Sequence, residues 1–123
     1  MIGYVTLGTN DLPRAAKFYD AIAAEMGVGR MMEGDNYIAW GLPKGAAGVA
    51  VMKPFDGNAA SVGNGVMVAL EAKDSGHVDR LYALALSIGG TDEGAPGVRG
   101  GGFYAGYFRD PDGNKLNAFV MTA

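Results

Sequence analysis

The sequence contains no cysteine and only one histidine, His77. The missing cysteines exclude disulfides, thiolate metal sites, iron–sulfur clusters and cysteine nucleophiles. His77 follows Ser75 and Gly76 in the first turn of a predicted helix, so we expect a solvated surface side chain. Any reaction that needs a histidine has only this candidate.

Basic residues and long apolar runs are also scarce. Ten Lys and Arg stand against 13 Asp and Glu, which gives a net charge of −3 and no basic stripe for nucleic acid. No apolar run approaches the ~20 residues of a membrane span, and the first residues lack the regions of a signal peptide. We therefore expect a cytoplasmic protein with neither a nucleic-acid nor a membrane partner.

What is present is typical of one soluble domain. The chain has 123 residues, of which 49% are hydrophobic and 19% charged, and this length is sufficient to bury a core. Glycine is abundant, with 21 residues that fall mainly at turns and at the ends of predicted strands. We therefore expect the chain to form a single folded domain.

The first half of the chain predicts a strand, a helix and three further strands. The helix begins at an N-cap, Asn10 or Asp11, carries Pro13 in its first turn and ends at Gly27. Alternation predicts the strands, with a turn at Pro43-Lys44-Gly45 before the last. The expected strands are Ile2–Gly8, Arg30–Met32, Tyr37–Leu42 and Gly48–Met52.

After a polar connector at residues 54–64, the same order begins again. A strand over Val66–Ala72 precedes a helix that is capped by Asp74 or Ser75 and stops at Gly89-Gly90. We expect residues 91–102, which are rich in glycine, to be irregular. Two strands then follow, Phe103–Phe108 and residues 116–121, joined by the turn sequence Asp110-Pro111-Asp112-Gly113.

This internal repeat decides the predicted fold. We expect an α+β protein with two βαβββ modules in tandem, curved mixed sheets and helices outside. Module one covers about residues 1–53, the connector 54–64 and module two 65–123, within a single domain. The concave side of the sheets is the natural place for a pocket.

Aromatic residues recur at matched places in the two modules. Tyr37 and Trp40 match Tyr104 and Tyr107 in spacing, on strands that should line the concavity. They are candidates for an aromatic pocket wall, with core packing as the equal alternative. Arg99 lies in the glycine-rich stretch, where it either closes over a ligand or is simply solvated. Turn formation explains Asp110 and Asp112 without any chemistry.

The chain resembles the vicinal oxygen chelate superfamily, which contains glyoxalase I, the bleomycin-resistance proteins and the extradiol dioxygenases. Three segments carry the resemblance, and together they span nearly the entire chain. They are Tyr4-Val-Thr-Leu-Gly-Thr-Asn-Asp-Leu12 with Phe18-Tyr19, Gly89-Gly-Thr-Asp-Glu-Gly-Ala-Pro-Gly97, and Phe108-Arg-Asp-Pro-Asp-Gly-Asn114. The family's fold is the one expected above, but that fold hosts enzymes and plain binders alike.

The resemblance also implies a divalent metal held by four strand positions, usually two His and two Glu. In this sequence they fall on Tyr4, the region of Ala50, Met67 and Asn117. None is a histidine or a carboxylate, the ligands that such a metal requires. We therefore expect no metal and no cofactor.

The function that these observations favour is reversible binding of a small, partly aromatic or apolar molecule, as in sequestration or resistance. Whether the protein is also an enzyme stays open at this point. One alternative is a lyase of the glyoxalase I type, which needs a Lewis acid and a carboxylate base. A second is a structural or interaction protein with a vestigial pocket. We expect a homodimer, and the candidate ligand-binding residues are Tyr4, Tyr37, Trp40, Met67, Arg99, Tyr104, Tyr107 and Asn117.

Overall fold

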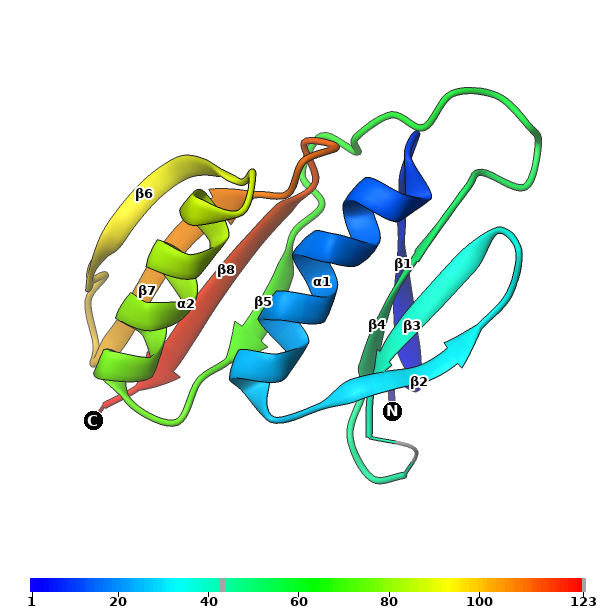
Figure 1. Ribbon diagram of the computed structural model, residues 1–123. Helices are drawn as coiled ribbons and strands as arrows, with labels where there is room; N and C mark the ends of the chain where they lie inside the picture. The colour runs from blue at the N-terminus through cyan, green and yellow to red at the C-terminus, as the bar shows by residue number, and fades with distance from the viewer. Residues whose placement is uncertain (43, 123) are drawn as a thin grey trace. The chain divides into compact units, whose positions relative to one another are not determined.

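A computed structural model describes residues 1–42 and 44–122, so Pro43 of the predicted turn lies outside the described residues. The chain divides into two compact units, Met1–Val62 and Gly63–Ala123. Each unit contains one helix and one four-stranded sheet (Figure 1). The order strand, helix and three strands occurs twice, which confirms the predicted α+β fold of tandem βαβββ modules.

The N-terminal unit has a mixed sheet. Its strand order is β1-β4-β3-β2, with β1 parallel to β4 and the other neighbours antiparallel. The elements are β1 (Tyr4–Gly8), α1 (Leu12–Met26), β2 (Gly29–Glu33), β3 (Tyr37–Gly41) and β4 (Gly48–Met52).

Helix α1 begins and ends at the predicted residues. The Asp11 carboxylate accepts a hydrogen bond from the Arg14 backbone N–H at 3.0 Å, and Gly27 ends the helix in the left-handed conformation with φ of 78°. The apolar face of the helix is buried, and the Tyr19 ring stacks on Trp40 of β3 at a centroid distance of 5.3 Å. The helix therefore covers one face of the first sheet and leaves the other face free of helix.

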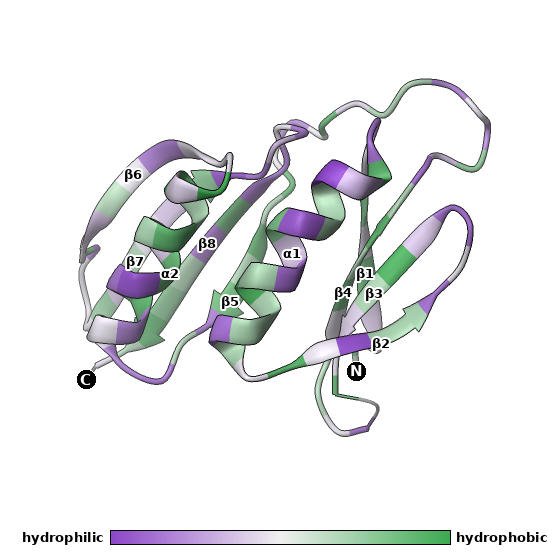
Figure 2. Cartoon of the chain, viewed as in Figure 1, coloured by the Kyte–Doolittle hydropathy of each residue, from purple (hydrophilic) through white to green (hydrophobic). Residues whose placement is uncertain are grey.

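The C-terminal unit repeats this arrangement. Its strand order is β5-β8-β7-β6, with β5 parallel to β8 and β7 antiparallel to both of its neighbours. Its elements are β5 (Val68–Glu71), α2 (Ser75–Ser87), β6 (Thr91–Val98), β7 (Phe103–Arg109) and β8 (Lys115–Met121). Figure 2 shows apolar residues concentrated on the strands and on part of each helix, with polar residues in the connections.

The turn between β7 and β8 is built around Asp110, as its sequence predicts. Its buried carboxylate accepts hydrogen bonds from the backbone N–H groups of Asp112 and Asn114 and from the Asn114 side chain, each at 2.9 Å. Gly113 takes the left-handed position at φ of 93°. Arg109 donates to Glu93 and to the Gly113 carbonyl, so it holds the turn and the edge of the sheet together.

The expectation that residues 91–102 are irregular is wrong for most of that stretch. Residues 91–98 form strand β6, which pairs with β7. The register shifts twice, between Asp92 and Gly94 and between Gly94 and Gly97. These bulges break the alternation by which a strand is recognised in a sequence, and Pro96 adds a further strand-breaking signal.

The expectation of a solvated His77 is also wrong. Its side chain is 3% exposed, and Nδ1 accepts a hydrogen bond from the Lys73 backbone N–H at 3.1 Å. The imidazole folds back over the first turn of α2 and satisfies a backbone donor just outside the helix. His77 lies in the first turn of α2, as predicted. The hydrogen bond to Lys73 could not be inferred from the residue type alone.

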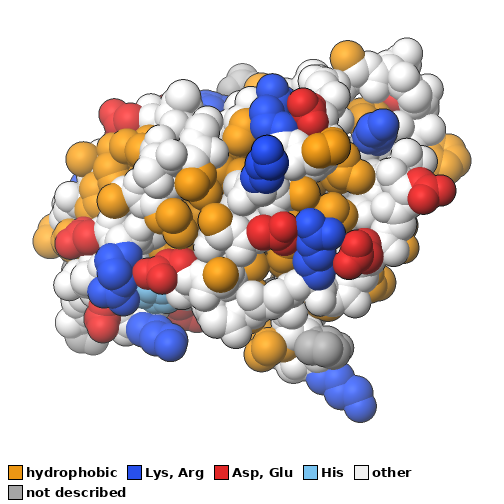
Figure 3. Space-filling view, viewed as in Figure 1, with side chains coloured by type: hydrophobic (Ala, Val, Ile, Leu, Met, Phe, Trp, Pro, Cys, Tyr) orange, Lys and Arg blue, Asp and Glu red, His pale blue; other side chains and the backbone are white. Residues whose placement is uncertain are grey.

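No helix in the described part of the chain is long and apolar enough to cross a membrane. Basic and acidic side chains are interspersed over the side shown in Figure 3. An ion pair between Arg30 of β2 and Asp20 of α1, at 2.8 Å, is one example. This mixed surface agrees with the absence of a basic stripe in the sequence.

Replacement of Asp110 by Ala should lower the free energy of unfolding by about 2–3 kcal/mol, because three donors lose a buried charged acceptor. Urea unfolding measures the change. Asp56→Ala is the matched control, since that exposed carboxylate accepts one backbone N–H at a turn. Equal effects of the two substitutions would contradict the role assigned to Asp110.

Candidate functional site

One row of side chains crosses the helix-free face of the first sheet. The strand register aligns Thr6 of β1 with Ala50 of β4, Ala50 with Ala39 of β3, and Ala39 with Met32 of β2. Residues directly opposite on neighbouring strands share a face. Two small alanines therefore form a shallow floor between a hydroxyl and a thioether.

Met32 reaches this row because β2 contains a bulge. Arg30 pairs with Trp40, but the next pair is Met32 with Ala39, so Met31 is the extra residue. Arg30 faces the helix side, where its guanidinium binds the Asp20 carboxylate at 2.8 Å. The bulge thus places a flexible apolar side chain at the edge of the helix-free face.

The row lies in a cavity of about 190 Å³. Tyr4 and Met52 add to its lining, and Tyr37 stands opposite Met52 on β3. The lining contains no charged group; its polar atoms come from two phenols and the Thr6 hydroxyl. Tyr4 and Tyr37, both predicted site residues, therefore belong to one cavity within the N-terminal unit.

Trp40 lies on the other face of the same sheet, so the expectation that it lines the concavity is wrong. It is 4% exposed, stacks on Tyr19 and donates its indole N–H to Asp20 at 2.8 Å. The hydrogen bond from Arg30, together with the bond from Trp40 and the charge of Arg30, lowers the pKa of Asp20. The odd spacing between Tyr37 and Trp40 puts them on opposite faces, which is the signal in the sequence that separates them.

Tyr104 is the second aromatic residue on the helix side. Its hydroxyl donates to the Asp79 carboxylate of α2 at 2.6 Å, and this bond raises the pKa of the phenol. Tyr104 and Tyr107 are separated by the same odd spacing as Tyr37 and Trp40. In each unit, therefore, one aromatic residue of the pair packs towards the helix and the other does not.

Tyr107 and Asn117 are neighbours in the second sheet, where the register aligns Asn117 with Tyr107 on β7 and with Ala69 on β5. Asn117 is 1% exposed, and its Oδ1 atom has no hydrogen-bond partner among the described residues. A buried carbonyl oxygen without a donor is costly. This atom is an acceptor available to a bound molecule or to water.

Arg99 lies next to Tyr107. Its guanidinium carbon is 5.4 Å from the centre of the Tyr107 ring, and Lys115 Nζ is 5.5 Å from the same centre. Arg99 also donates to the Ala95 carbonyl at 2.6 Å. These contacts place the Arg99 guanidinium over the ring of Tyr107, another predicted site residue. Arg99 itself is the first residue of the connection between β6 and β7.

Comparisons with a family model and with solved structures place this architecture among known proteins. A model of the glyoxalase/bleomycin resistance protein/dioxygenase superfamily matches residues 1–118. A glyoxalase/bleomycin resistance protein from Albidiferax ferrireducens T118 is 34% identical, with a TM-score of 0.90 and 98% of each chain covered. The comparison with curated proteins gives no match.

Two more distant structures share the fold. A glyoxalase-related enzyme from Fulvimarina pelagi is 20% identical, with a TM-score of 0.78 over 98% of this chain and 87% of its own. A lactoylglutathione lyase from Agrobacterium tumefaciens is 19% identical, with a TM-score of 0.71 over 98% of this chain and 92% of its own.

The tandem βαβββ modules define a class of proteins with a helix-free sheet face in each module. Within that class, the chain belongs to the glyoxalase/bleomycin resistance protein/dioxygenase superfamily, as the match over residues 1–118 shows. The resemblance drawn from the sequence motifs is thereby confirmed.

The strand registers relate to one another the four positions on which, by the resemblance, the family's metal ligands fall. Ala50 of β4 lies opposite Thr6 of the parallel strand β1, and Asn117 of β8 lies opposite Ala69 of the parallel strand β5. Tyr4 lies two residues before Thr6, and Met67 lies two residues before Ala69, just outside β5. The internal repeat therefore relates Tyr4 to Met67 and Ala50 to Asn117.

These four residues do not fit a divalent metal. Ala50 offers no donor atom and Met67 only a soft thioether, while Tyr4 and Asn117 offer a phenol and an amide. No group of three or more His, Asp or Glu in the described part of the chain could hold a metal ion. The four matched positions therefore do not supply the ligands that the resemblance implies for the family's metal.

Sequence reasoning missed several residues of the cavity. Thr6, Met32, Ala39 and Met52 were not among the candidates, although Thr6 follows Tyr4, and Ala39 follows Tyr37, by two residues along a strand. The two-residue period of a strand therefore could have identified Thr6 and Ala39. It could not have identified Met32, because the bulge in β2 interrupts the period.

We predict that purified protein without an affinity tag contains no stoichiometric Zn²⁺, Ni²⁺, Mn²⁺ or Fe²⁺, and that titration with each ion gives no binding heat. The reason is the ligand set at Tyr4, Ala50, Met67 and Asn117. Elemental analysis and calorimetry measure this. One tightly held metal per chain would contradict the matched positions.

Asn117→Leu should raise the free energy of unfolding by about 1 kcal/mol, because it removes a buried acceptor that lacks a partner and keeps a similar volume. Asn114→Leu is the control: Asn114 is also buried, but it bonds to Asp110, and its replacement should destabilise the fold. Urea unfolding compares the two. Destabilisation by Asn117→Leu would show that the native protein satisfies the amide.

Proposed function

We propose that this protein reversibly binds a small, partly aromatic or apolar molecule without a metal, in a sequestering or resistance-like role. The observation that carries the proposal is the cavity of about 190 Å³ on the helix-free face of the first sheet, with its uncharged lining. A role of this kind requires burial and complementary shape, and no nucleophile or base.

The size of the cavity narrows the class of ligand. An apolar cavity of about 150 Å³ is sufficient to bind benzene. The cavity described here is somewhat larger and suits one ring with a small substituent. Its two tyrosines are well exposed, Tyr4 at 53% and Tyr37 at 36%, so their rings have surface to bury against a ligand.

The polar atoms of the lining favour a ligand with a single polar group. The hydroxyls of Tyr4, Tyr37 and Thr6 can donate or accept a hydrogen bond. Met32 and Met52 adapt to irregular shapes because their side chains are unbranched and flexible. A phenol or a similar substituted ring meets both requirements, whereas a dianion would find no charge to balance it.

The second sheet supplies further candidate contacts within the proposal. Tyr107 offers a ring, Asn117 an unpartnered Oδ1 atom, and Arg99 a cation close to that ring. These groups would suit a ligand that carries a hydrogen-bond donor. Our proposal also includes a homodimer and a cytoplasmic location, as expected from the family resemblance and from the composition.

The alternative function is a lyase of the glyoxalase I type, as the name of the relative from Agrobacterium tumefaciens suggests. That chemistry requires a Lewis acid and a carboxylate base. The cavity lining contains neither a carboxylate nor an imidazole. Binding without turnover is therefore the better-supported reading.

The test uses protein labelled with ¹³C at the methionine methyl groups and p-cresol as the probe. We expect saturable shifts at Met32 and Met52, which line the cavity, and none at Met26 of α1 or Met121 of β8. The p-cresol should be recovered unchanged. Absence of shifts at Met32 and Met52 would contradict the proposed site, and conversion of the probe would favour an enzyme.

Tyr37→Ala should weaken p-cresol binding about tenfold, because an aromatic contact worth about 1 kcal/mol or more is removed. Tyr82→Ala is the matched control, since Tyr82 lies on α2 and donates to Asp92 at 2.7 Å. Equal weakening by both variants would show that the effect is not specific to the cavity.

A further inference from the structure

A second, larger cavity lies where the connector after β4 folds over the ends of β1 and β4. Its volume is about 410 Å³, and all of its lining belongs to the N-terminal unit. The lining is polar, in contrast to the cavity on the helix-free face. It is formed by Thr9, Asn10, Asn36, Lys53, Pro54, Phe55, Gly57, Asn58 and Ala59.

Hydrogen bonds hold the connector in this shape. The Asn10 side chain accepts from the Ala60 backbone N–H at 2.6 Å and donates to the Ala60 carbonyl at 3.2 Å. Gly57 N–H donates to the Pro54 carbonyl at 3.1 Å, and Gly57 adopts φ of 77°. The wall of the cavity is thus formed before any ligand arrives, which lowers the entropic penalty of binding.

The floor of the cavity is equally fixed. The Thr9 backbone N–H donates to the Met52 carbonyl at 3.1 Å, and the Lys53 backbone N–H donates to the Asn36 carbonyl at 2.8 Å. These bonds continue the sheet beyond the ends of β1 and β4. They place the side chain of Lys53 at a rigid point of the backbone.

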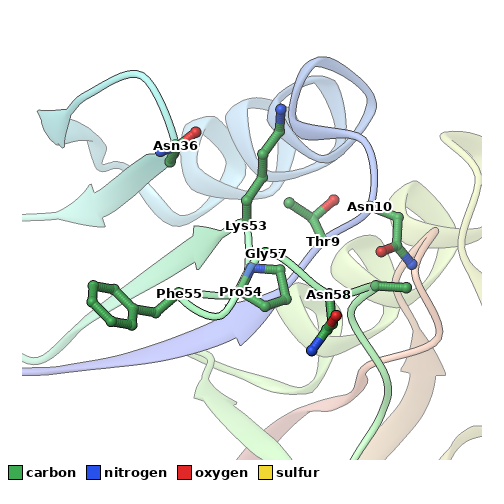
Figure 4. Close-up of a pocket in the computed structure, with 9 residues that line it drawn as sticks. Thr9, Asn10, Asn36, Lys53, Pro54, Phe55, Gly57 and Asn58 are labelled. Atoms are coloured by element: carbon green, nitrogen blue, oxygen red, sulfur yellow. The ribbon is translucent and has the colours of Figure 1, made fainter.

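Among the described residues that line the cavity, Lys53 is the only charged one. Figure 4 shows the Lys53 side chain extending away from the connector on the side of Asn36, the Asn58 side chain pointing the opposite way, and the Phe55 ring turned outward. No ion pair of the Lys53 side chain is recorded in the described part of the chain. Two carboxylates are next in sequence to lining residues: Asp35 precedes Asn36, and Asp56 follows Phe55. Neither lines the cavity, and the Asp56 carboxylate accepts a hydrogen bond from the Asn58 backbone N–H at 2.9 Å.

We propose that this cavity binds a small organic molecule through a terminal carboxylate, which Lys53 pairs with and the side-chain amide of Asn36 helps to hold. An ammonium group and amide N–H groups are donors that suit a carboxylate. One lysine balances one negative charge, so a monocarboxylate fits better than a doubly charged phosphate ester. The Phe55 ring, which is 101% exposed, is available at the rim for the organic part.

This site is separate from the one proposed above and does not rest on it. The two sites use different residues, different faces of the unit and different ligand chemistry. A failure of one proposal therefore leaves the other intact.

The experiment is a titration of the ¹⁵N-labelled full chain with benzoate, and separately with benzamide, its uncharged analogue. Benzoate should produce saturable shifts in the backbone amides of Lys53, Gly57, Asn58 and Ala59 and in the side-chain amide of Asn36. Benzamide should bind at least about tenfold more weakly, because it lacks the charge.

Lys53→Met should weaken benzoate binding at least about tenfold, since a charge-assisted bond is lost while the aliphatic stem is kept. Lys17→Met, on the exposed face of α1, is the matched control and should bind benzoate like the native chain. Equal binding of benzoate and benzamide, unchanged binding by Lys53→Met, or shifts confined to the Tyr4 and Tyr37 cavity would each overturn the proposal.

Discussion

A single helix packed on one face of each four-stranded sheet is the constraint on which the rest of this structure depends. Because strand side chains alternate between faces, every strand residue either packs beneath the helix or lies on the face without one. Trp40 and Tyr19 make this division visible in the N-terminal unit, where their stacked rings join β3 to α1. The cavity of the same unit is formed by the residues on the opposite side.

Much of this fold could be predicted from the sequence, because its signals are local. The caps at Asp11 and Gly27 and the turn at Asp110 have the chemistry that such positions require, and the structure confirms them.

The residues of the site were harder to predict from the sequence. Tyr4 and Tyr37 share a cavity, but the face of an aromatic residue depends on the parity of its position along the strand, and similar spacing in two modules placed Trp40 and Tyr104 on the wrong side. Strand β6 and the bulge in β2 depend on register shifts, which composition does not reveal.

The chain belongs to a family for which the resemblance implies a metal, yet the residues at the four matched positions are poor metal ligands. The four positions to which the resemblance assigns the family's metal ligands are related in pairs by the internal repeat. The side chains at those positions are small, apolar or uncharged. Membership of the family fixes the fold, but it does not fix the chemistry of these sheet faces.

The bulge at Met31 shows how little such a change requires. It gives Arg30 and Glu33 the same side of the sheet, where they form an ion pair at 3.1 Å, although residues three apart on a regular strand face opposite ways. With regular pairing after Arg30, Glu33 would stand opposite Tyr37 and bring a carboxylate to the edge of the apolar cavity. One extra backbone residue therefore sets the charge of this face. A slip of one position in β2 would turn a surface suited to uncharged rings into one suited to cations, with no change in amino-acid composition.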